Sequence, residues 1–433
     1  MKKLFVLLIC LTLLAIAVCA CKDGETETPT TPASDAPTEA PTEAPTEAPT
    51  EEPTCAPADP ATLGEPTGYY ENSKGSTLTS YTGATEESYR GARSYFSSLG
   101  YTLYTENDLN GVLAATYQKG TEVMHVYYVP STGELNVAYD AMSELPEQEA
   151  EPTVGNVIPF VTQLSAREIN GMGYIIQLSD GSFIIEDGGY NTNIKLLNET
   201  LTTLNGGEEG IRIRLWILSH SHDDHYPCFT DSIRRGFLDN VQIDCVAYYP
   251  VNTADEFIYS GSGFFNSKQF SGLIDQLREK GTRLCTLHTG MTFTFSDFKV
   301  DVLMAADELY IDGKHDNFNA SSSVCRFTNT NGVSLLLLAD ANYESAYRMR
   351  DFYGDFLKSD MCQAAHHGVE DFPMEVYDII QPSILFYPCT QSLYDLTDRD
   401  ANVRTALREA PYIKEILVRE STVYTRYFDE LKK

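Results

Sequence analysis

The spacing of hydrophobic and polar positions changes several times along the chain, and each pattern predicts a different kind of structure. Residues 22–60 hold almost no apolar run, and their Pro, Thr, Glu and Ala residues include the repeat APTEAPTEAPTEAPTEEPT. Such a segment cannot bury a core, and its prolines and like charges keep it extended. We therefore expect a disordered Pro/Thr/Glu-rich linker over residues 21–66.

Residues 67–147 have the pattern of a small α+β domain. The stretch ATEESYRGARSYFSSLGYTLY has the spacing of a helix followed by a strand. VLAATYQKG, EVMHVYYVP and ELNVAYDA then alternate like strands of one sheet, with turns at Lys119-Gly120 and at 131–133. The tyrosines in these strands fit either structural packing or a ligand-binding face. Residues 145–153 are typical of a linker.

Residues 154–433 predict a larger domain in which strands and helices alternate. Three strands, NVIPFVTQL, GYIIQL and SFIIEDGG, are expected around the turn Ser179-Asp180-Gly181. A helix is expected near 191–205, and RIRLWILS has the pattern of a buried strand. Further helices are expected near 228–238, 266–280, 343–358 and 401–409. Further strands are expected near 242–250, 283–287, 292–304, 322–329, 333–339, 361–365, 383–388 and 415–419. Alternation over this length favours a layered α/β fold.

The first residues predict where the protein resides. MKKLFVLLICLTLLAIAVCAC places two lysines before an apolar run too short to span a bilayer, which is typical of a secretory signal. Val18-Cys19-Ala20-Cys21 resembles the lipobox of bacterial lipoproteins, which implies a signal peptide over 1–20 and lipidation of Cys21. An ordinary secretory signal is the alternative. We expect a lipid-anchored protein on the extracytoplasmic face of a bacterial cell membrane.

Charge and cysteine spacing narrow the partners and cofactors. The formal net charge is −31, so a long nucleic acid strand is repelled. Beyond the linker the cysteines are single and lack the close spacing of a zinc ribbon or redox motif. They are Cys228, Cys245, Cys285, Cys325, Cys362 and Cys389. For these six, disulfides and buried free thiols are both open alternatives.

The candidate chemistry lies at the end of the buried strand in LWILSHSHDDHYPC. His220, His222, Asp224 and His225 follow that strand directly, and Asp224 and His225 are expected to begin a helix. Imidazole nitrogen and carboxylate oxygen are ligands that zinc takes in proteins. The chain has only eight histidines, and solvated loop histidines would be more scattered. The grouping therefore favours a metal site.

Two later strand ends extend this group. SLLLLADANYES places Asp340 at the end of an apolar strand, where a carboxylate is costly unless it is paired or bound to metal. MCQAAHHGVED places His366 and His367 at the end of another strand. Because side chains alternate along a strand, one histidine of this pair is expected to bind metal and the other to face the substrate.

These motifs resemble the metallo-β-lactamase superfamily over residues 154–433. The resemblance includes Glu186-Asp187-Gly188-Gly189, the His-x-His-x-Asp-His loop, the strand-ending Asp340 and the His-His-Gly ending. ASSSVCRF, at 320–327, and the His-His-Gly ending are most similar to the branch with the ComEC nuclease domain and the phosphorylcholine esterase. The implied fold is an αββα sandwich with metals at one edge of its sheets.

The resemblance also implies a ligand set for two metal ions. Zinc is the expected metal, and manganese and iron are the alternatives. The first ion is bound by His220 and His222, the second by Asp224, His225 and His367, and both by Asp340. His366 then faces the substrate as an acid or oxyanion donor, and Asp224 also orients the nucleophile. The third ligand of the first ion stays open among Asn319, His288 and His315. Asp187 is expected to orient a ligand histidine.

The implied activity is metal-assisted hydrolysis, with a phosphodiester as the expected bond because the most similar branch acts on such bonds. A small-molecule or cell-wall phosphodiester suits the acidic chain better than DNA or RNA, whose cleavage is the alternative. The Asn-x-Tyr-Gly-His-Pro-like ending of the competence nuclease is replaced by SILFYPCTQS, which also disfavours DNA. A non-catalytic metal- or cell-wall-binding lipoprotein is a second alternative.

Overall fold

A computed structural model describes most of the chain beyond the predicted linker. The described residues are 55–71, 75–164, 168, 170–207, 209–249, 267–307, 318–368, 372–396, 401–418 and 424–431. The predicted signal peptide, Cys21, the linker up to residue 54 and His315 lie outside them. Within these described ranges, no helix has the length and apolar character needed to cross a membrane.

The last part of the predicted linker belongs to the folded structure. Pro60–Leu63 form a short 3-10 helix, η1, and the Asp59 side chain accepts a hydrogen bond from the Ala61 N–H at its start. The Ala58 N–H donates to the Gly91 carbonyl at 3.0 Å. A Cβ at Gly91 would lie 2.9 Å from the Ala58 Cβ, so only glycine allows this approach. The folded chain therefore starts upstream of residue 67.

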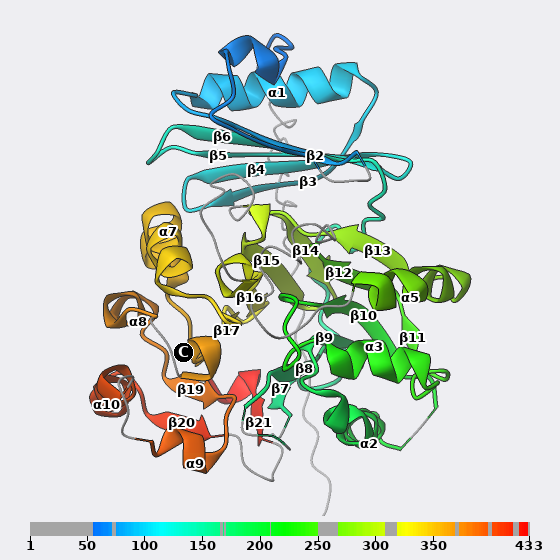
Figure 1. The fold of residues 1–433 in the computed structure, drawn as a ribbon, viewed down its shortest axis with the longest axis vertical. Helices are drawn as coiled ribbons and strands as arrows, with labels where there is room; N and C mark the ends of the chain where they lie inside the picture. Colours follow the sequence, from blue (N-terminus) through cyan, green and yellow to red (C-terminus); the bar gives the residue numbers. More distant parts are fainter. Residues whose placement is uncertain are drawn as a thin grey trace, which may run out of the picture. The chain divides into compact units, whose positions relative to one another are not determined.

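Residues 68–140 form a six-stranded antiparallel sheet with one long helix (Figure 1). The helix α1, Glu86–Ser98, starts after Thr85, which forms a capping box with Ser88. The strand order is β1-β2-β6-β5-β4-β3. The strands are β1 Gly68–Glu71, β2 Thr77–Tyr81, β3 Thr102–Leu109, β4 Val112–Lys119, β5 Glu122–Val129 and β6 Glu134–Asp140. The alternating pattern predicts β3 to β6 but not β1 and β2, which offer too few alternations.

Both faces of this small sheet are buried. On one face Tyr117 packs against Phe96 of α1, with ring centroids 5.7 Å apart. On the other face Tyr127 shares a hydrophobic core with Leu303 and Tyr353, which belong to the larger region. These tyrosines therefore serve packing, and the second face of the sheet is covered by the rest of the chain.

The larger region contains two sheets (Figure 1). In the first sheet the order is β13-β12-β10-β9-β8-β7-β21, with β11 also paired to β10. Its strands are β7 Phe160–Gln163, β8 Gly173–Gln177, β9 Phe183–Asp187, β10 Arg212–Ile217, β11 Gln242–Ile243, β12 Cys245–Tyr248, β13 Arg283–Thr286 and β21 Tyr424–Tyr427. In the second sheet the order is β14-β15-β16-β17-β18-β19-β20. Its strands are β14 Thr292–Phe295, β15 Phe298–Met304, β16 Val324–Asn329, β17 Ser334–Leu337, β18 Met361–Gln363, β19 Ile384–Tyr387 and β20 Glu415–Val418.

One hydrophobic core lies between the two sheets and joins residues such as Ile217 of β10 to Phe327 of β16. A second set of apolar residues packs the first sheet against α2 Ile194–Leu204, α3 Pro227–Arg234 and α5 Ser267–Glu279. A third packs the second sheet against α7 Tyr343–Tyr353, α8 Met374–Ile380 and α10 Ala401–Glu409. The layers follow the order helix, sheet, sheet, helix, which confirms the αββα sandwich predicted from the sequence.

Some element boundaries differ from the sequence-based expectation. The strand expected over 292–304 is a hairpin, because Ser296 adopts a left-handed conformation with φ 52° and the chain reverses there. The helix expected over 343–358 ends at Tyr353, where Gly354 has a φ of 48°. The pattern also misses α8. All six cysteines beyond the linker are buried free thiols in this structure.

The topology brings several strand ends to one edge. β9 and β10 are parallel neighbours in the first sheet, and β17, β18 and β19 are parallel neighbours in the second. The carboxyl ends of parallel strands meet at the same edge of a sheet. Side chains that follow Ile217, Leu337 and Gln363 therefore converge there.

Candidate metal centre

The first group of candidate residues lies on a turn between β10 and α3. The His225 and Tyr226 N–H groups both point to the His222 carbonyl, at 3.3 and 3.4 Å. The expectation that a helix begins at Asp224 is wrong, because α3 begins only at Pro227, which occupies its first turn. The turn lets His220, His222, Asp224 and His225 approach one another more closely than a straight helix would.

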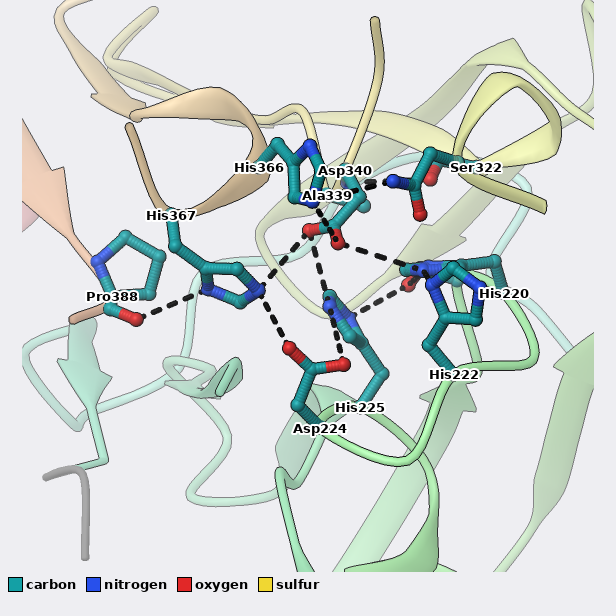
Figure 2. Close-up of polar contacts among 12 residues, drawn as sticks. His220, His222, Asp224, His225, Ser322, Ala339, Asp340, His366, His367 and Pro388 are labelled. Carbon is teal, nitrogen blue, oxygen red and sulfur yellow. Dashed lines mark hydrogen bonds and ion pairs between the residues drawn. The ribbon is translucent and has the colours of Figure 1, made fainter. Parts of the chain in front are cut away.

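The structure brings the predicted ligands together in two groups that share one carboxylate. Asp224, His225, Asp340 and His367 form the first group, and His220, His222 and Asp340 form the other. Within each group the candidate donor atoms lie within 4.8 Å of one another. In Figure 2 the side chains of the 220–225 turn and of His367 converge with Asp340, so three separate segments contribute to the two groups.

The two oxygens of Asp340 face different partners. Asp340 Oδ1 lies 3.1 Å from His225 Nε2 and 3.5 Å from His367 Nε2. Asp340 Oδ2 lies 3.7 Å from His220 Nε2. Asp340 is 1 % exposed. The two oxygens of one buried carboxylate thus face the two groups of candidate donors.

The donor atoms fit a divalent cation. His225 Nε2, His367 Nε2 and Asp340 Oδ1 are buried, and none of them makes a hydrogen bond of good geometry with the described residues. Buried polar atoms in folded proteins almost always have a partner, so three such atoms within one small space call for one. Imidazole nitrogens and carboxylate oxygens suit zinc, and also manganese or iron.

The far nitrogens of the same histidines are fixed by the protein. His225 Nδ1 lies 2.7 Å from Asp187 Oδ2, and His367 Nδ1 lies 3.1 Å from the Pro388 carbonyl. Asp187 is itself held by the Ser219 N–H at 2.8 Å. Such partners fix the tautomer and ring orientation of a metal-binding histidine. Asp187 therefore stands where the sequence analysis expects a residue that orients a ligand.

The charges of the site depend on one another. Burial favours the neutral form of His225, but Asp340 and Asp187 outweigh burial and raise the pKa of His225 well above its usual value. Burial also opposes the charge on His367, whose pKa Asp340 and Asp224 nevertheless raise to about 9. In His220, burial and the nearby His225 lower the pKa. The carboxylates thus draw positive charge into the site, and a bound cation would provide the same charge.

The two adjacent histidines occupy different environments. His367 is buried, and its Nε2 lies 2.9 Å from Asp224 Oδ2. The His366 side chain is 17 % exposed and lies 3.6 Å from Asp340 Oδ2. The sequence analysis expects the two rings to point apart because side chains alternate along a strand. That reason is wrong, because the pair is not in a strand: φ is 46° at His366 and 55° at His367. The left-handed turn, continued by Gly368, separates the two rings.

The structure places the three candidates for the third ligand of the first ion differently. Asn319 lies beside the site, with its Nδ2 3.2 Å from His366 Nε2. His288 lies elsewhere, paired with Asp140 and Asp307, so it is not a ligand of this centre. His315 falls outside the described residues.

Two residues of the site have no signal in the sequence pattern. Asn170 donates from Nδ2 to Asp224 Oδ2 at 2.8 Å, and the Tyr190 hydroxyl donates to Asn170 Oδ1 at 3.1 Å. Asn170 follows β7 in a polar connection, where asparagine is common for conformational reasons. Tyr190 follows the Asp187-Gly188-Gly189 turn, and only that proximity could have marked it.

Comparisons with known proteins give fold-level likenesses. No protein-family model matches the chain, and no match is found among curated proteins. Among solved structures, the chain is similar to the metallo-beta-lactamase fold protein YhfI from Bacillus subtilis, with 14 % identity and a TM-score of 0.37 over 62 % of this chain and all of that one.

Two further solved structures are similar to a comparable extent. One is CmlA, a diiron beta-hydroxylase from Streptomyces venezuelae, with 13 % identity and a TM-score of 0.36, covering 64 % of this chain and 55 % of that chain. The chain thus spans about half the length of CmlA. The other is Igni18, a metallo hydrolase from the archaeon Ignicoccus hospitalis, with 11 % identity and a TM-score of 0.36, covering 62 % of this chain and 98 % of that chain.

Proposed function

We propose that the chain is a metal-dependent hydrolase, and more specifically a binuclear zinc phosphodiesterase. The observation that carries the proposal is the pair of donor groups that share Asp340, with buried donor atoms that lack hydrogen bonds. Divalent ions held there would polarise the scissile group and lower the pKa of a water molecule to about 7. Asp224, His225 and His367 would hold one ion, His220 and His222 the other, and Asp340 both.

The remaining chemistry falls to side chains next to these donors. His366 is the partly exposed member of its pair, and Asn319 contacts its Nε2. His366 is proposed to donate a hydrogen bond to an oxygen of the substrate as negative charge develops there; because an amide nitrogen only donates, donation from Nε2 requires the Asn319 amide to turn its oxygen towards Nε2. Asp224 keeps its carboxylate at the centre of the site, where it orients the attacking water. Both roles suit hydrolysis of a phosphodiester.

A small or wall-linked phosphodiester suits the chain better than a nucleic acid. The formal net charge of −31 disfavours a polyanion at long range, and a small zwitterionic ester experiences little of that repulsion. Cleavage of DNA or RNA is the alternative within the same chemistry. A chain that binds metal or cell wall without turnover is the alternative outside it.

The experiment that tests the proposal combines metal content with turnover. The purified chain is expected to hold close to two zinc ions, by elemental analysis, and to hydrolyse bis(p-nitrophenyl) phosphate. His222→Ala and Asp340→Asn should each lower turnover by more than about 100-fold, the upper end for partners outside the coordination shell.

A matched control is Asp360→Asn, at the opposite end of β17 from Asp340. Asp360 accepts a hydrogen bond from the Ser334 N–H at 3.0 Å and is remote from the donor groups. Its activity should match that of the wild type. A wild-type chain that binds no metal after reconstitution would refute the proposal. Metal binding without turnover of this ester, or of a nucleic acid, would favour a non-catalytic protein.

We also propose that the protein is anchored through lipid at Cys21 on the extracytoplasmic face of the membrane. The support is the lipobox-like Val18-Cys19-Ala20-Cys21 after an apolar run, followed at once by charged residues. Cys21→Ala should move the protein from the membrane fraction to the soluble extracytoplasmic fraction. An unchanged distribution would contradict lipid anchoring.

A further inference from the structure

Asn170 connects the metal centre to a residue outside it. Its Nδ2 donates to Asp224 Oδ2 at 2.8 Å, and its Oδ1 accepts from the Tyr190 hydroxyl at 3.1 Å. The orientation of the amide follows from the partners, because a carboxylate accepts only and a hydroxyl can donate. The opposite orientation would place the amide oxygen against the carboxylate. Both the amide nitrogen and the amide oxygen of Asn170 therefore have a hydrogen-bond partner.

The backbone around Asn170 is fixed just as closely. Asn170 forms an isolated β-bridge with Cys389, the residue after Pro388. The Met172 N–H donates to the Asp224 carbonyl at 2.9 Å. A Cβ at Gly171, where φ is 119°, would lie 3.2 Å from that carbonyl oxygen. One short segment thus contacts both the backbone and the carboxylate of Asp224.

The same segment lies next to the support of His367. Pro388, whose carbonyl accepts from His367 Nδ1 at 3.1 Å, precedes the residue that bridges to Asn170. His367 Nε2 lies 2.9 Å from Asp224 Oδ2, the oxygen that Asn170 also contacts. Asp224 Oδ1 lies 3.8 Å from His225 Nε2. Asn170 therefore fixes which oxygen of Asp224 faces His367 and which faces His225.

We propose that Asn170 is a positioning residue for the donor group of Asp224, His225, Asp340 and His367, with Tyr190 holding its amide in place. The carboxyl torsion of an aspartate is broad, so an unsupported Asp224 samples many orientations. Asn170 reduces that freedom before the cation binds, and as a neutral amide it leaves the negative charge of the carboxylate available. This inference rests on the proposed function, because it requires that the group binds a divalent cation.

Zinc affinity measures this role without relying on activity. The chain is titrated with Zn²⁺ in competition with a chromophoric chelator, which resolves the two binding steps. Asn170→Ala should weaken one of the two steps by about 10- to 100-fold, the range for residues that orient metal ligands, and leave the other near the wild type. Tyr190→Phe, which removes only a hydroxyl, should weaken the same step by a smaller factor. At saturating zinc, hydrolysis by Asn170→Ala should recover towards the wild-type rate.

Asn193→Ala is the matched control. Asn193 is a buried asparagine of the same region, but its Nδ2 contacts the Gly188 carbonyl at 3.2 Å and not a carboxylate of the site. It should leave both zinc steps unchanged in the folded protein. Equal weakening in Asn170→Ala and Asn193→Ala, or wild-type affinity in both Asn170→Ala and Tyr190→Phe, would overturn the inference. Absence of zinc binding by the wild type would overturn the proposed function as well.

Discussion

Two buried clusters of histidine and aspartate occur in the described part of this chain, and they differ in how completely their atoms are paired. At the junction between the small sheet and the larger region, His288 Nδ1 lies 2.7 Å from Asp307 and His288 Nε2 lies 2.8 Å from Asp140. Its neighbour His125 contacts Thr116 and the Thr289 carbonyl, both at 2.9 Å. Every imidazole nitrogen of this junction cluster has a protein partner.

The metal centre uses the same residue types differently. Each of His225 and His367 has one nitrogen held by the protein and one buried nitrogen that lacks a hydrogen bond. Clustering of titratable residues therefore does not identify a ligand site by itself. The distinguishing feature is a set of buried donor atoms that lie close to one another and make no hydrogen bond of good geometry among the described residues.

The electrostatics of the junction cluster agree with a structural role. Burial favours neutral His288, yet Asp307 and Asp140 raise its pKa well above the usual value, so it bridges two carboxylates as a cation. Burial and the charge of His288 lower the pKa of the stacked His125 to about 3. Neutral His125 donates from Nε2, because the Thr289 carbonyl can only accept. The cluster thus completes its own hydrogen bonds.

The largest expected effect comes from removing the bridging cation of the junction. His288→Ala leaves Asp140 and Asp307 buried without their common partner. Breaking a buried ion pair in this way costs about 3–5 kcal/mol of unfolding free energy. Urea unfolding with a chelator present, so that bound metal does not contribute, measures the loss. A loss below about 1 kcal/mol, which is typical of exposed pairs, would contradict the structural role.

Urea unfolding with added zinc distinguishes the roles of the two clusters. A ligand at 100 times its Kd stabilises the folded state by about 2.7 kcal/mol. His288→Ala should keep this increment on top of its lower stability, because the metal centre is intact. His367→Ala should lose most of it. Loss of the increment in His288→Ala would place His288 in the metal centre after all.

The sequence predicts the metal centre better than it predicts the difference between the clusters. His220, His222, Asp224 and His225 are close in the chain, and strand ends locate the other candidate ligands, so local pattern is sufficient to group them. His288 also closes a strand, but its partner Asp140 lies 148 positions away, and no local pattern reports such a pairing. The sequence therefore leaves His288 open as a ligand.

In the fold, too, the sequence predicts the features that depend on local pattern and misses those that depend on contacts between distant residues. Strands of the larger region follow from long apolar or alternating runs, and their order favours a layered α/β fold, whereas the αββα sandwich is what the family resemblance implies. The hairpin at Ser296 is missed because its only local signal is the polar pair Ser296-Asp297, which shifts the alternation by one position. Asn170 escapes because its function depends on contacts made only in the folded chain, with Asp224 and Tyr190.

Glu186 sharpens the comparison, because it has buried atoms without hydrogen bonds but belongs to neither donor group. Both of its side-chain oxygens are buried and lack hydrogen-bond partners among the described residues. Burial, with a smaller contribution from Asp187, raises the pKa of Glu186 well above its usual value. Unused hydrogen-bonding capacity in a single side chain should affect stability but not cation binding.

The pH dependence of Glu186 has a definite sign. The folded state keeps the proton that the unfolded chain releases near pH 4.3, so stability is fully present below that pH and declines as the pH rises towards the raised pKa. The decline is about 1.4 kcal/mol per pH unit within that window. Glu186→Gln should remove the slope in urea unfolding at a series of pH values and leave zinc affinity unchanged. A persistent slope, or weaker zinc binding, would count against this assignment.

The smallest expected effect concerns the backbone, where the two clusters also differ. Of the seven non-glycine residues with positive φ among those described, four border the metal centre: Asp187, Ala339, His366 and His367. The junction uses glycine at its own positive-φ position, Gly290. Strain of this kind persists only where the surroundings impose it. At Ala339, the His366 N–H and Gln363 Nε2 both donate to the carbonyl, at 2.9 and 3.0 Å.

Ala339→Gly tests whether that strain is real, with Ala341→Gly as the matched control. Both alanines are fully buried, so each change loses one methyl group and adds chain entropy, about 1–2 kcal/mol together. Only Ala339 has a positive φ, whose relief returns about 1–2 kcal/mol. Ala339→Gly should therefore change the unfolding free energy by less than about 0.5 kcal/mol, whereas Ala341→Gly should show the full loss. Equal losses would mean that the backbone before Asp340 is unstrained.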